Sequence, residues 1–433
     1  MAPVELEADR LDLTRWVRPG SGVVASQACG EPVGLVDALI EAAGSGALDG
    51  VSYYCGLTWR EVLAAPEAAG IDVVSYGVLG ALARVAAVRP VRVVPSHFSA
   101  HPGLFAHREL PGDVALIQVA PPGPDGRCSF GVDTTYIADA VLHAHSVIAE
   151  VNAQMPSVPG ASIAYDDLTA VVHTDRPLLE APPARETDAD RAIAAHVVGL
   201  VRDGDTLQVG VGALPEAILR GLHGARDLGI HSGMICDPVV DLVASGAVTG
   251  ARKPVDTGLI VTGAALGSSK LFAFLDGDER TVQRPVSFTH RADTLTRVGR
   301  LVAINGAVEV DLTGQANAER AGTRMVGAVG GQVDFLRGAA ASGGEGVIAL
   351  PSVVAKTGAT RIVARLSGPV TTARADVGTV VTEHGVARLR GLDLAERAAA
   401  LIAIAAPEHR EALAREAAAA GPQRGGAVIV NRR

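Results

Sequence analysis

The sequence predicts an α/β protein of two domains, each with a mostly parallel sheet covered by helices. Three observations favour this fold. The chain has 433 residues, about two to three times the length of an ordinary domain. Short apolar runs alternate with helical segments, as in parallel sheets that are buried on both faces. Two segments, 17–41 and 201–222, also resemble each other, which indicates a duplicated unit.

Each of the two similar segments predicts a strand, a glycine-rich turn and a helix. Both begin with V-R-x-G, continue into an apolar run and reach a Pro near the first turn of the expected helix. The spacing of these features is almost the same in both. Because many strand–turn–helix units share such features, the similarity also fits two unrelated units.

The boundary between the domains is expected in the segment 176–197, which is rich in Pro and charged residues and ends near a predicted helix N-cap. We therefore assign residues 1–185 to an N-terminal domain and residues 186–433 to a C-terminal domain. An Ala-rich stretch, 394–420, predicts two helices separated at Pro407. Further strands are expected in the apolar runs 259–266, 300–312, 346–354, 361–366 and 377–389.

Composition narrows the class of protein. A net charge of −9 argues against a nucleic-acid-binding protein but leaves room for a small anionic ligand at a helix N-terminus. The four cysteines form no C-x-x-C pair, which is typical of reduced thiols. The N-terminus has no apolar signal segment, and no apolar run is long enough to span a membrane. These features, with many Ala, Gly and Arg residues, predict a cytoplasmic bacterial protein.

Two kinds of segment carry candidate chemistry. The glycine-rich stretch 210–219 follows an apolar strand and opens a helix, so its N–H groups are able to bind an anion. It is not the dinucleotide fingerprint, because Pro215 replaces the third glycine, and an ordinary tight turn explains it equally well. Gln315, Asn317 and Gln332 lie in glycine-rich turns, where a buried amide needs either a partner in the protein or a ligand.

Several segments resemble the acetyl-CoA hydrolase/transferase family along nearly the whole chain. They are GDVALIQVAPPGPDGRCSFGVDTTYIADAV, VIAEVNAQMP, GVGALPEAIL, INGAVEVDLTGQANAE, GGQVDFLRGA, ALPSVVAKTGATRIV, VVTEHGVARLRG and RAAALIAIAAPEHR. The resemblance implies two tandem CoA-transferase-type (NagB/RpiA-like) α/β domains with an active site between them, and a homodimer. It also implies that acyl-CoA and a carboxylate are the substrates and that no metal takes part.

The resemblance also implies which residues bind these molecules. The coenzyme A site would consist of Gly210, Val211, Gly212, Ala213, Leu214, Gly331 and Lys356. Lys356 is able to act as a point charge for a phosphate, and also fits an ordinary surface lysine. The acyl side would be contacted by His97, His101, Asn152, Gln315, Asn317 and Gln332. The four-residue spacing of His97 and His101 would also suit a metal, but the family resemblance favours substrate contact.

The sequence departs from the family at its most characteristic motif. Relatives have His-Ser/Thr-Glu-Met, in which the Glu attacks the acyl-CoA and then carries CoA as a glutamyl thioester. Here the stretch IHSGM places Gly233 at the position of that nucleophile. A carboxylate suits the role because it is ionised at neutral pH. Gly233 has no side chain, so this route is closed.

Three interpretations remain. The first, which we favour, is hydrolysis or related acyl chemistry, with water in the space that the missing side chain leaves empty. The second is CoA transfer by another nucleophile: Ser232, Cys236 and Asp237 are nearby, His231 is a candidate base, and Glu309 is the best remaining carboxylate in a family-like segment. The third is a protein that binds acyl-CoA without catalysis.

Overall fold

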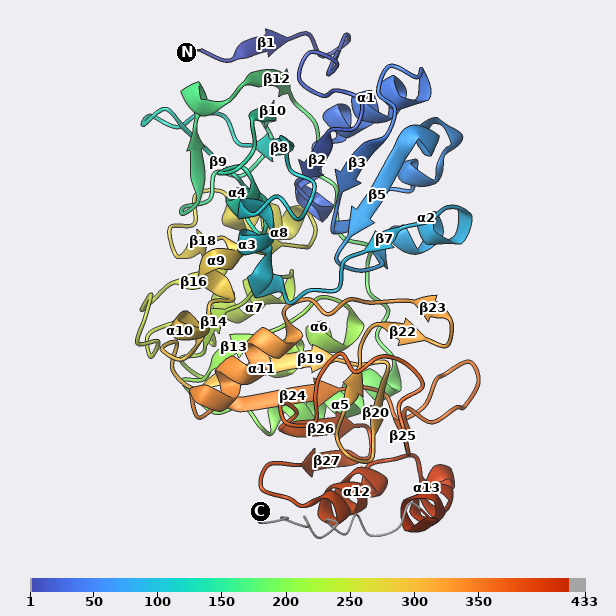
Figure 1. The fold of residues 1–433 in the computed structure, drawn as a ribbon. Helices are drawn as coiled ribbons and strands as arrows, with labels where there is room; N and C mark the ends of the chain where they lie inside the picture. The colour runs from blue at the N-terminus through green and yellow to red at the C-terminus, as the bar shows by residue number, and fades with distance from the viewer. Residues whose placement is uncertain (1, 420–433) are drawn as a thin grey trace, which may run out of the picture.

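The computed structural model describes residues 2–419, which form two α/β domains (Figure 1). The N-terminal domain has an eight-stranded sheet in the order β1-β12-β10-β8-β2-β3-β5-β7, with every pair parallel. Its strands are β1 (Val4–Leu6), β2 (Gly22–Ala25), β3 (Val51–Tyr54), β5 (Ile71–Ser75), β7 (Arg92–Val93), β8 (Val114–Val119), β10 (Ser146–Asn152) and β12 (Ala170–Thr174). Its α-helices are α1 (Val33–Gly44), α2 (Leu82–Val88), α3 (His101–Ala106) and α4 (Ile137–Ala140).

The C-terminal domain has a second eight-stranded sheet in the order β18-β16-β14-β13-β19-β24-β26-β27, parallel except for the pair β26–β27. The strands are β13 (Thr206–Gln208), β14 (Gly229–His231), β16 (Ile260–Thr262), β18 (Thr281–Gln283), β19 (Leu301–Gly306), β24 (Glu345–Ala349), β26 (Thr379–Thr382) and β27 (Gly385–Arg388). A small sheet beside it joins β20 (Glu309–Asp311), β21 (Ala316–Asn317) and β25 (Ile362–Val363). The predicted mostly parallel α/β fold is confirmed.

Helices of the C-terminal domain begin where the sequence signals predict. Helix α5 (Asp188–Val198) starts after Thr187, whose side chain forms a reciprocal capping box with Asp190. The Ala-rich tail forms α12 (Leu394–Ala403) and α13 (Pro407–Ala419), with Pro407 as the first residue of the second helix. The others are α6 (Ala213–Gly221), α7 (Pro238–Ala244), α8 (Ser269–Leu275), α9 (Val286–Thr289), α10 (Ala292–Leu295) and α11 (Gln332–Ala341).

Seven strands of each large sheet follow the same order, which supports the duplication. In each, the first strand of the repeated unit is central: β2 in one sheet and β13 in the other. The next three strands of that sheet lie to one side, β3-β5-β7 and β14-β16-β18. The following three lie to the other side, β8-β10-β12 and β19-β24-β26. The first sheet ends at residue 174 and the second begins at residue 206, so both fit a domain boundary near 185, which stays a prediction.

The domains meet along a shared apolar core. One cluster of buried residues joins Ala28 and Val132 of the N-terminal domain to Leu207, Ile230 and Ile304 of the C-terminal domain. Helix α3 of the first domain lies beside α9 of the second (Figure 1). All four cysteines are free and buried. Within residues 2–419, no helix is long and apolar enough to cross a membrane.

Candidate active site

Gly233 lies in a tight turn just after β14, and Ser232 ties this turn to the glycine-rich loop. The Ser232 hydroxyl donates to the carbonyl oxygen of Val209 at 3.0 Å. It also accepts from the N–H groups of Val209, at 3.3 Å, and Met234, at 3.4 Å. Val209 directly follows β13 and leads into Gly210. The fold thus brings the nucleophile position and the predicted CoA-binding loop together.

The loop from Gly210 to Leu214 leads into α6 and is partly exposed along its length. Gly212 precedes the helix with φ of 115°, a conformation that residues with a Cβ rarely adopt. The N–H groups of the first turn of α6 have no partner within the helix. This geometry suits an anionic ligand, and the assignment of the loop to coenzyme A stays a prediction.

The imidazole of His290 occupies the space in front of Gly233. A Cβ atom at Gly233 would lie 2.8 Å from Cε1 of His290, 3.1 Å from its Nε2 and 3.7 Å from Cε2 of Phe335. A Cβ atom at Gly331 would lie 2.5 Å from the same Nε2. The His290 ring therefore occupies part of the space at Gly233 that was expected to be empty for water. His290 could not be predicted as a site residue, because SFTHRAD matches no recognisable motif. Only the fold places the His290 ring against Gly233 and Gly331.

A loop of the N-terminal domain completes this junction. His97 pairs with Gly330 through the backbone, and the N–H of Phe98 donates to the carbonyl oxygen of Gly330 at 2.9 Å. Ser99 donates its hydroxyl to Asp334 at 2.7 Å. Within the described part of the chain, Nδ1 of His97 is buried without a hydrogen-bond partner. The structure thus brings His97 beside the loop that carries Gly331.

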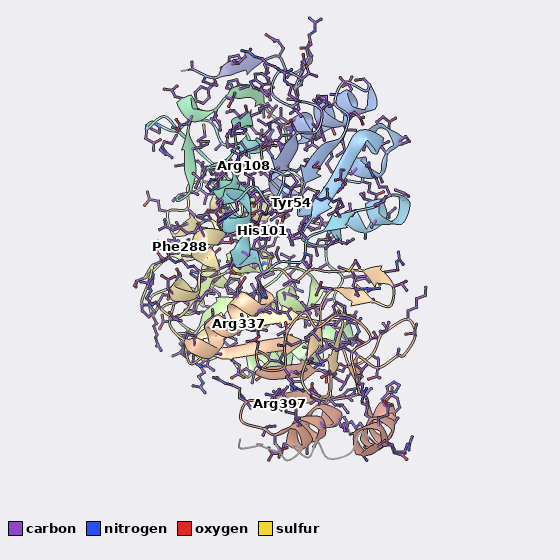
Figure 2. The ribbon with its side chains drawn as sticks, viewed as in Figure 1. Tyr54, His101, Arg108, Phe288, Arg337 and Arg397 are labelled. Carbon is purple, nitrogen blue, oxygen red and sulfur yellow. The ribbon has the colours of Figure 1, made fainter. Side chains whose placement is uncertain are left out.

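His101 has a different position from the one expected. It is fully buried, and its Nδ1 lies 3.0 Å from the carbonyl oxygen of Phe98, an acceptor that requires Nδ1 to carry the proton. The Tyr54 hydroxyl then donates to Nε2 at 2.6 Å (Figure 2). Because both ring nitrogens have protein partners, His101 supports the loop at His97 and Phe98 rather than contacting a substrate.

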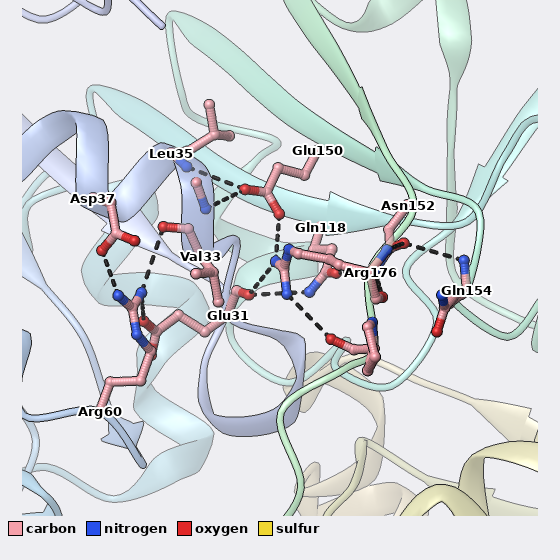
Figure 3. A network of polar contacts seen from close by, with 12 residues as sticks. Glu31, Val33, Leu35, Asp37, Arg60, Gln118, Glu150, Asn152, Gln154 and Arg176 are labelled. Carbon is pink, nitrogen blue, oxygen red and sulfur yellow. Dashed lines mark hydrogen bonds and ion pairs between the residues drawn. The ribbon is translucent and has the colours of Figure 1, made fainter. Parts of the chain in front are cut away.

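Asn152 is also a structural residue. It is fully buried at the end of β10, and its amide donates to Gln118 at 2.7 Å and to the carbonyl oxygen of Arg176 at 2.9 Å. Figure 3 shows it at the edge of a polar network that includes Glu150 and Glu31. The expectation that Asn152 faces a ligand is not supported, because these contacts use both amide hydrogens.

The carboxylate of Glu309 has several hydrogen-bond partners within the protein. Its buried carboxylate accepts from the amide of Asn317 at 3.0 Å, from the N–H and hydroxyl of Ser367, and from the N–H of Gly368. None of these residues is among the nearest neighbours of Gly233. Through these bonds Glu309 holds the small β20–β21 sheet against the 367–368 loop, and a place beside an acyl group stays a prediction.

The remaining predicted site residues either hydrogen-bond to other residues of the protein or lie at the surface. Gln315 donates to Asp311 at 2.8 Å, and Gln332 donates to Thr372 at 2.8 Å. The open question about these amides is thus answered by protein partners. Lys356 is exposed in the loop after β24, which fits a surface lysine and leaves its phosphate contact a prediction.

The side chains beside Gly233 that could replace the nucleophile are engaged elsewhere. Burial raises the pKa of Cys236 to about 12, so this thiol stays protonated. Asp237 accepts from the N–H and hydroxyl of Ser268 at 2.9 and 2.7 Å. His231 is fully buried and donates Nε2–H to the carbonyl oxygen of Thr289 at 3.0 Å. His231 therefore positions the residue next to His290. Its buried Nδ1 has no hydrogen-bond partner among the described residues, so its role as a base stays a prediction.

One further carboxylate lies near the turn. Asp133 pairs through its backbone with Ala264, whose N–H donates to the carbonyl oxygen of Gly233 at 3.1 Å. Burial raises the pKa of Asp133 to about 6. Its oxygens accept from the N–H of Gln27 at 2.8 Å and from the Thr135 hydroxyl at 2.6 Å, so it braces the junction between the domains.

Three buried histidines predict acid sensitivity. Burial lowers the pKa of His101 and His231 to about 4 and that of His290 to about 3. In the unfolded chain a histidine gains its proton near pH ~6.5. The stability that these neutral rings contribute is thus complete above pH ~6.5 and is lost as the pH falls toward ~4.

Each ring should contribute a slope of about 1.4 kcal/mol per pH unit in that window. Urea unfolding at several pH values measures this slope. The variant His101→Asn should lower it by about one such increment, whatever its absolute stability. An unchanged slope would mean that His101 is protonated in the folded protein.

No three His, Cys, Asp or Glu side chains gather as a metal-ion site in residues 2–419.

Comparison with known proteins shows the family to which the chain belongs. Residues 10–179 match the acetyl-CoA hydrolase/transferase N-terminal domain, and residues 267–417 match the C-terminal domain of the same name. The chain belongs to the acetyl-CoA hydrolase/transferase family.

Known proteins that are similar to the chain include both transferases and hydrolases. The 4-hydroxybutyrate coenzyme A transferase of Clostridium kluyveri is 42% identical over 326 residues, which cover 74% of this chain and 76% of that protein. An acetyl-CoA hydrolase of Saccharomyces cerevisiae is 31% identical over 235 residues, 51% of this chain and 43% of that protein. The crystal structure of RipA from Yersinia pestis has a TM-score of 0.87 at 33% identity, covering 93% of this chain and 94% of that one.

Proposed function

We propose that this protein hydrolyses an acyl-CoA thioester through direct attack by water, without a glutamyl-CoA intermediate. The proposal depends on one observation: at Gly233, where the family resemblance places the nucleophilic carboxylate, the nearest side chains are an imidazole and a phenyl ring. Neither Glu309 nor Asp133 takes over, because the oxygens of both are hydrogen-bonded within the protein.

The rest of the site supports acyl-CoA chemistry. The loop from Gly210 to Leu214 and the first turn of α6 offer backbone N–H groups to a phosphate or to a developing oxyanion. Such donors do not depend on a glutamate at position 233. They supply a large share of catalysis in acyl transfer, so hydrolysis remains feasible after the nucleophile is lost.

CoA transfer is the second candidate function. It is favoured by the names of similar proteins, among them the 4-hydroxybutyrate coenzyme A transferase at 42% identity. Transfer would need another group on the protein to carry the acyl or CoA moiety. Ser232, Cys236 and Asp237 are poorly suited, because a hydrogen-bonded hydroxyl, a protonated thiol and an engaged carboxylate are poor nucleophiles.

A panel of acyl-CoAs tests the proposal. We expect the purified protein to release free CoA thiol at a rate that does not depend on added acetate, with no change in the mass of the protein. Acetate-dependent formation of acetyl-CoA from another acyl-CoA would establish transfer instead. Binding of the acyl-CoAs without turnover would contradict the proposal and identify a non-catalytic binding protein.

A further inference from the structure

His290 faces the two glycines that the family resemblance places in the active site. It follows α9 directly, and only 4% of its surface is exposed. Its Nε2 edge lies between Gly233 and Gly331: a Cβ atom at either position would approach Nε2 within 3.1 or 2.5 Å. Both positions must therefore be glycine for the ring to occupy this place. The ring thus lies against the position at which the family resemblance implies a carboxylate.

The ring is held in one orientation. Phe98 of the N-terminal domain and Phe335 of α11 pack against it, with ring centroids 5.1 and 4.6 Å away. On the opposite edge, Nδ1 lies 2.9 Å from the hydroxyl oxygen of Thr289. The Thr289 carbonyl is held in turn by His231. Groups from both domains thus aim the Nε2 edge at the glycines.

The contacts of Thr289 allow the proton of the ring to lie on Nδ1. The Thr289 hydroxyl has a single hydrogen, and it lies 3.2 Å from the carbonyl oxygen of Pro285, which only accepts. When the hydroxyl donates there, Nδ1 of His290 is the donor to the Thr289 oxygen. Nε2 then has a free lone pair, and among residues 2–419 it has no hydrogen-bond partner. This lone pair faces Gly233 and Gly331.

The ring has the neutral state that a general base needs, although it is a weak base on its own. Burial, together with the neighbouring His231 and His101, lowers the pKa of His290 to about 3, so the ring is neutral at physiological pH. Negative charge on a substrate beside a histidine favours the protonated form. The oxyanion that forms when a thioester is attacked would therefore strengthen the base as the proton moves.

We propose that His290 is the general base of the hydrolytic reaction, an inference that rests on the proposed function. Nε2 takes a proton from a water molecule while the water oxygen forms a bond to the acyl carbon. The tetrahedral intermediate then collapses, the carbon–sulfur bond breaks, and the imidazolium returns its proton to the departing thiolate. The products are coenzyme A and a carboxylic acid, which releases its remaining proton to solvent. The protein is never acylated.

The variant His290→Ala tests this role. We expect kcat for thiol release to fall at least ~100-fold, the usual contribution of a general base, with little change in KM for the acyl-CoA. Added imidazole should enter the space left between Gly233 and Gly331 and restore turnover. Pyrazole, which has the same shape but is far less basic, should not. His101→Ala is the matched control, because it also removes a buried histidine: its loss should appear as a lower Tm without rescue by imidazole.

The outcomes separate the two proposals. If the wild-type protein releases no thiol, the proposed function is wrong, and the general-base role of His290 fails with it. If the wild-type protein is active and His290→Ala keeps its kcat, only the role of His290 is overturned. Equal rescue by imidazole and pyrazole would mean that the ring merely fills space. An acyl adduct on His290 during turnover would make this residue a nucleophile and would contradict both the general-base role and direct attack by water.

Discussion

The paired substitution of Gly233→Glu and His290→Gly is expected to convert the protein from hydrolysis to CoA transfer, while Gly233→Glu alone is not. A side chain at position 233 would begin 2.8 Å from the His290 ring, which Phe98 and Phe335 hold in place. Removing the ring opens this space. A glutamate there would be ionised at neutral pH and able to attack the thioester.

Two measured rates, thiol release and acetyl-CoA formation, would show the conversion from hydrolysis to CoA transfer. Hydrolysis should fall at least ~100-fold with loss of the base, and acetyl-CoA should form from another acyl-CoA when acetate is present. His290→Gly alone is the matched control, and it should lose hydrolysis without gaining transfer. Should Gly233→Glu alone transfer CoA at full thermal stability, the ring would be mobile and the steric argument would be wrong.

Glu150→Gln is expected to destabilise the fold by about 3–5 kcal/mol, the usual effect of breaking a buried ion pair. The Glu150 side chain is fully buried in β10 and pairs with Arg176 in the connection between the domains. It also accepts from the N–H groups of Gly34 and Leu35 at the start of α1 (Figure 3). A glutamine leaves the half-buried guanidinium of Arg176 without its counter-charge.

An exposed ion pair provides the control for this prediction. Asp72 pairs with Arg92, and their side chains are 39% and 62% exposed. Asp72→Asn should cost less than about 1 kcal/mol, because water screens such a pair. Urea unfolding of both variants compares the two effects directly. Equal losses would show that Glu150 is no more important to the fold than a surface carboxylate.

Local patterns in the sequence predicted the architecture well, because those patterns act within a few residues. The repeated strand–glycine–helix unit became β2–α1 and β13–α6 at equivalent places in two sheets that share the order of seven strands. Pro407 begins α13, and Thr187 caps α5. In each case the residue that fixes the element lies inside or beside it.

The site was less predictable, because its residues find their partners through the fold. Glu309 and Asn317 are candidates for contact with a ligand when the sequence alone is considered, yet in the structure they bond to each other. His101 was expected at the substrate, yet its ring is bonded by Tyr54 and Phe98. His290 gave no signal, since its position against Gly233 and Gly331 depends on the packing of α9 and α11.

Oxygen isotope transfer in a single turnover tests most directly whether water attacks the acyl carbon without a covalent intermediate on the protein. Excess enzyme would be mixed with an acyl-CoA in ¹⁸O-labelled water. Mass spectrometry would then measure the masses of the released acid and of the peptides of the protein. Direct attack predicts that the label enters the released acid and that every protein carboxylate stays unlabelled. Label in a protein carboxylate after the first turnover would contradict it, because it would reveal an acyl or CoA adduct on the chain.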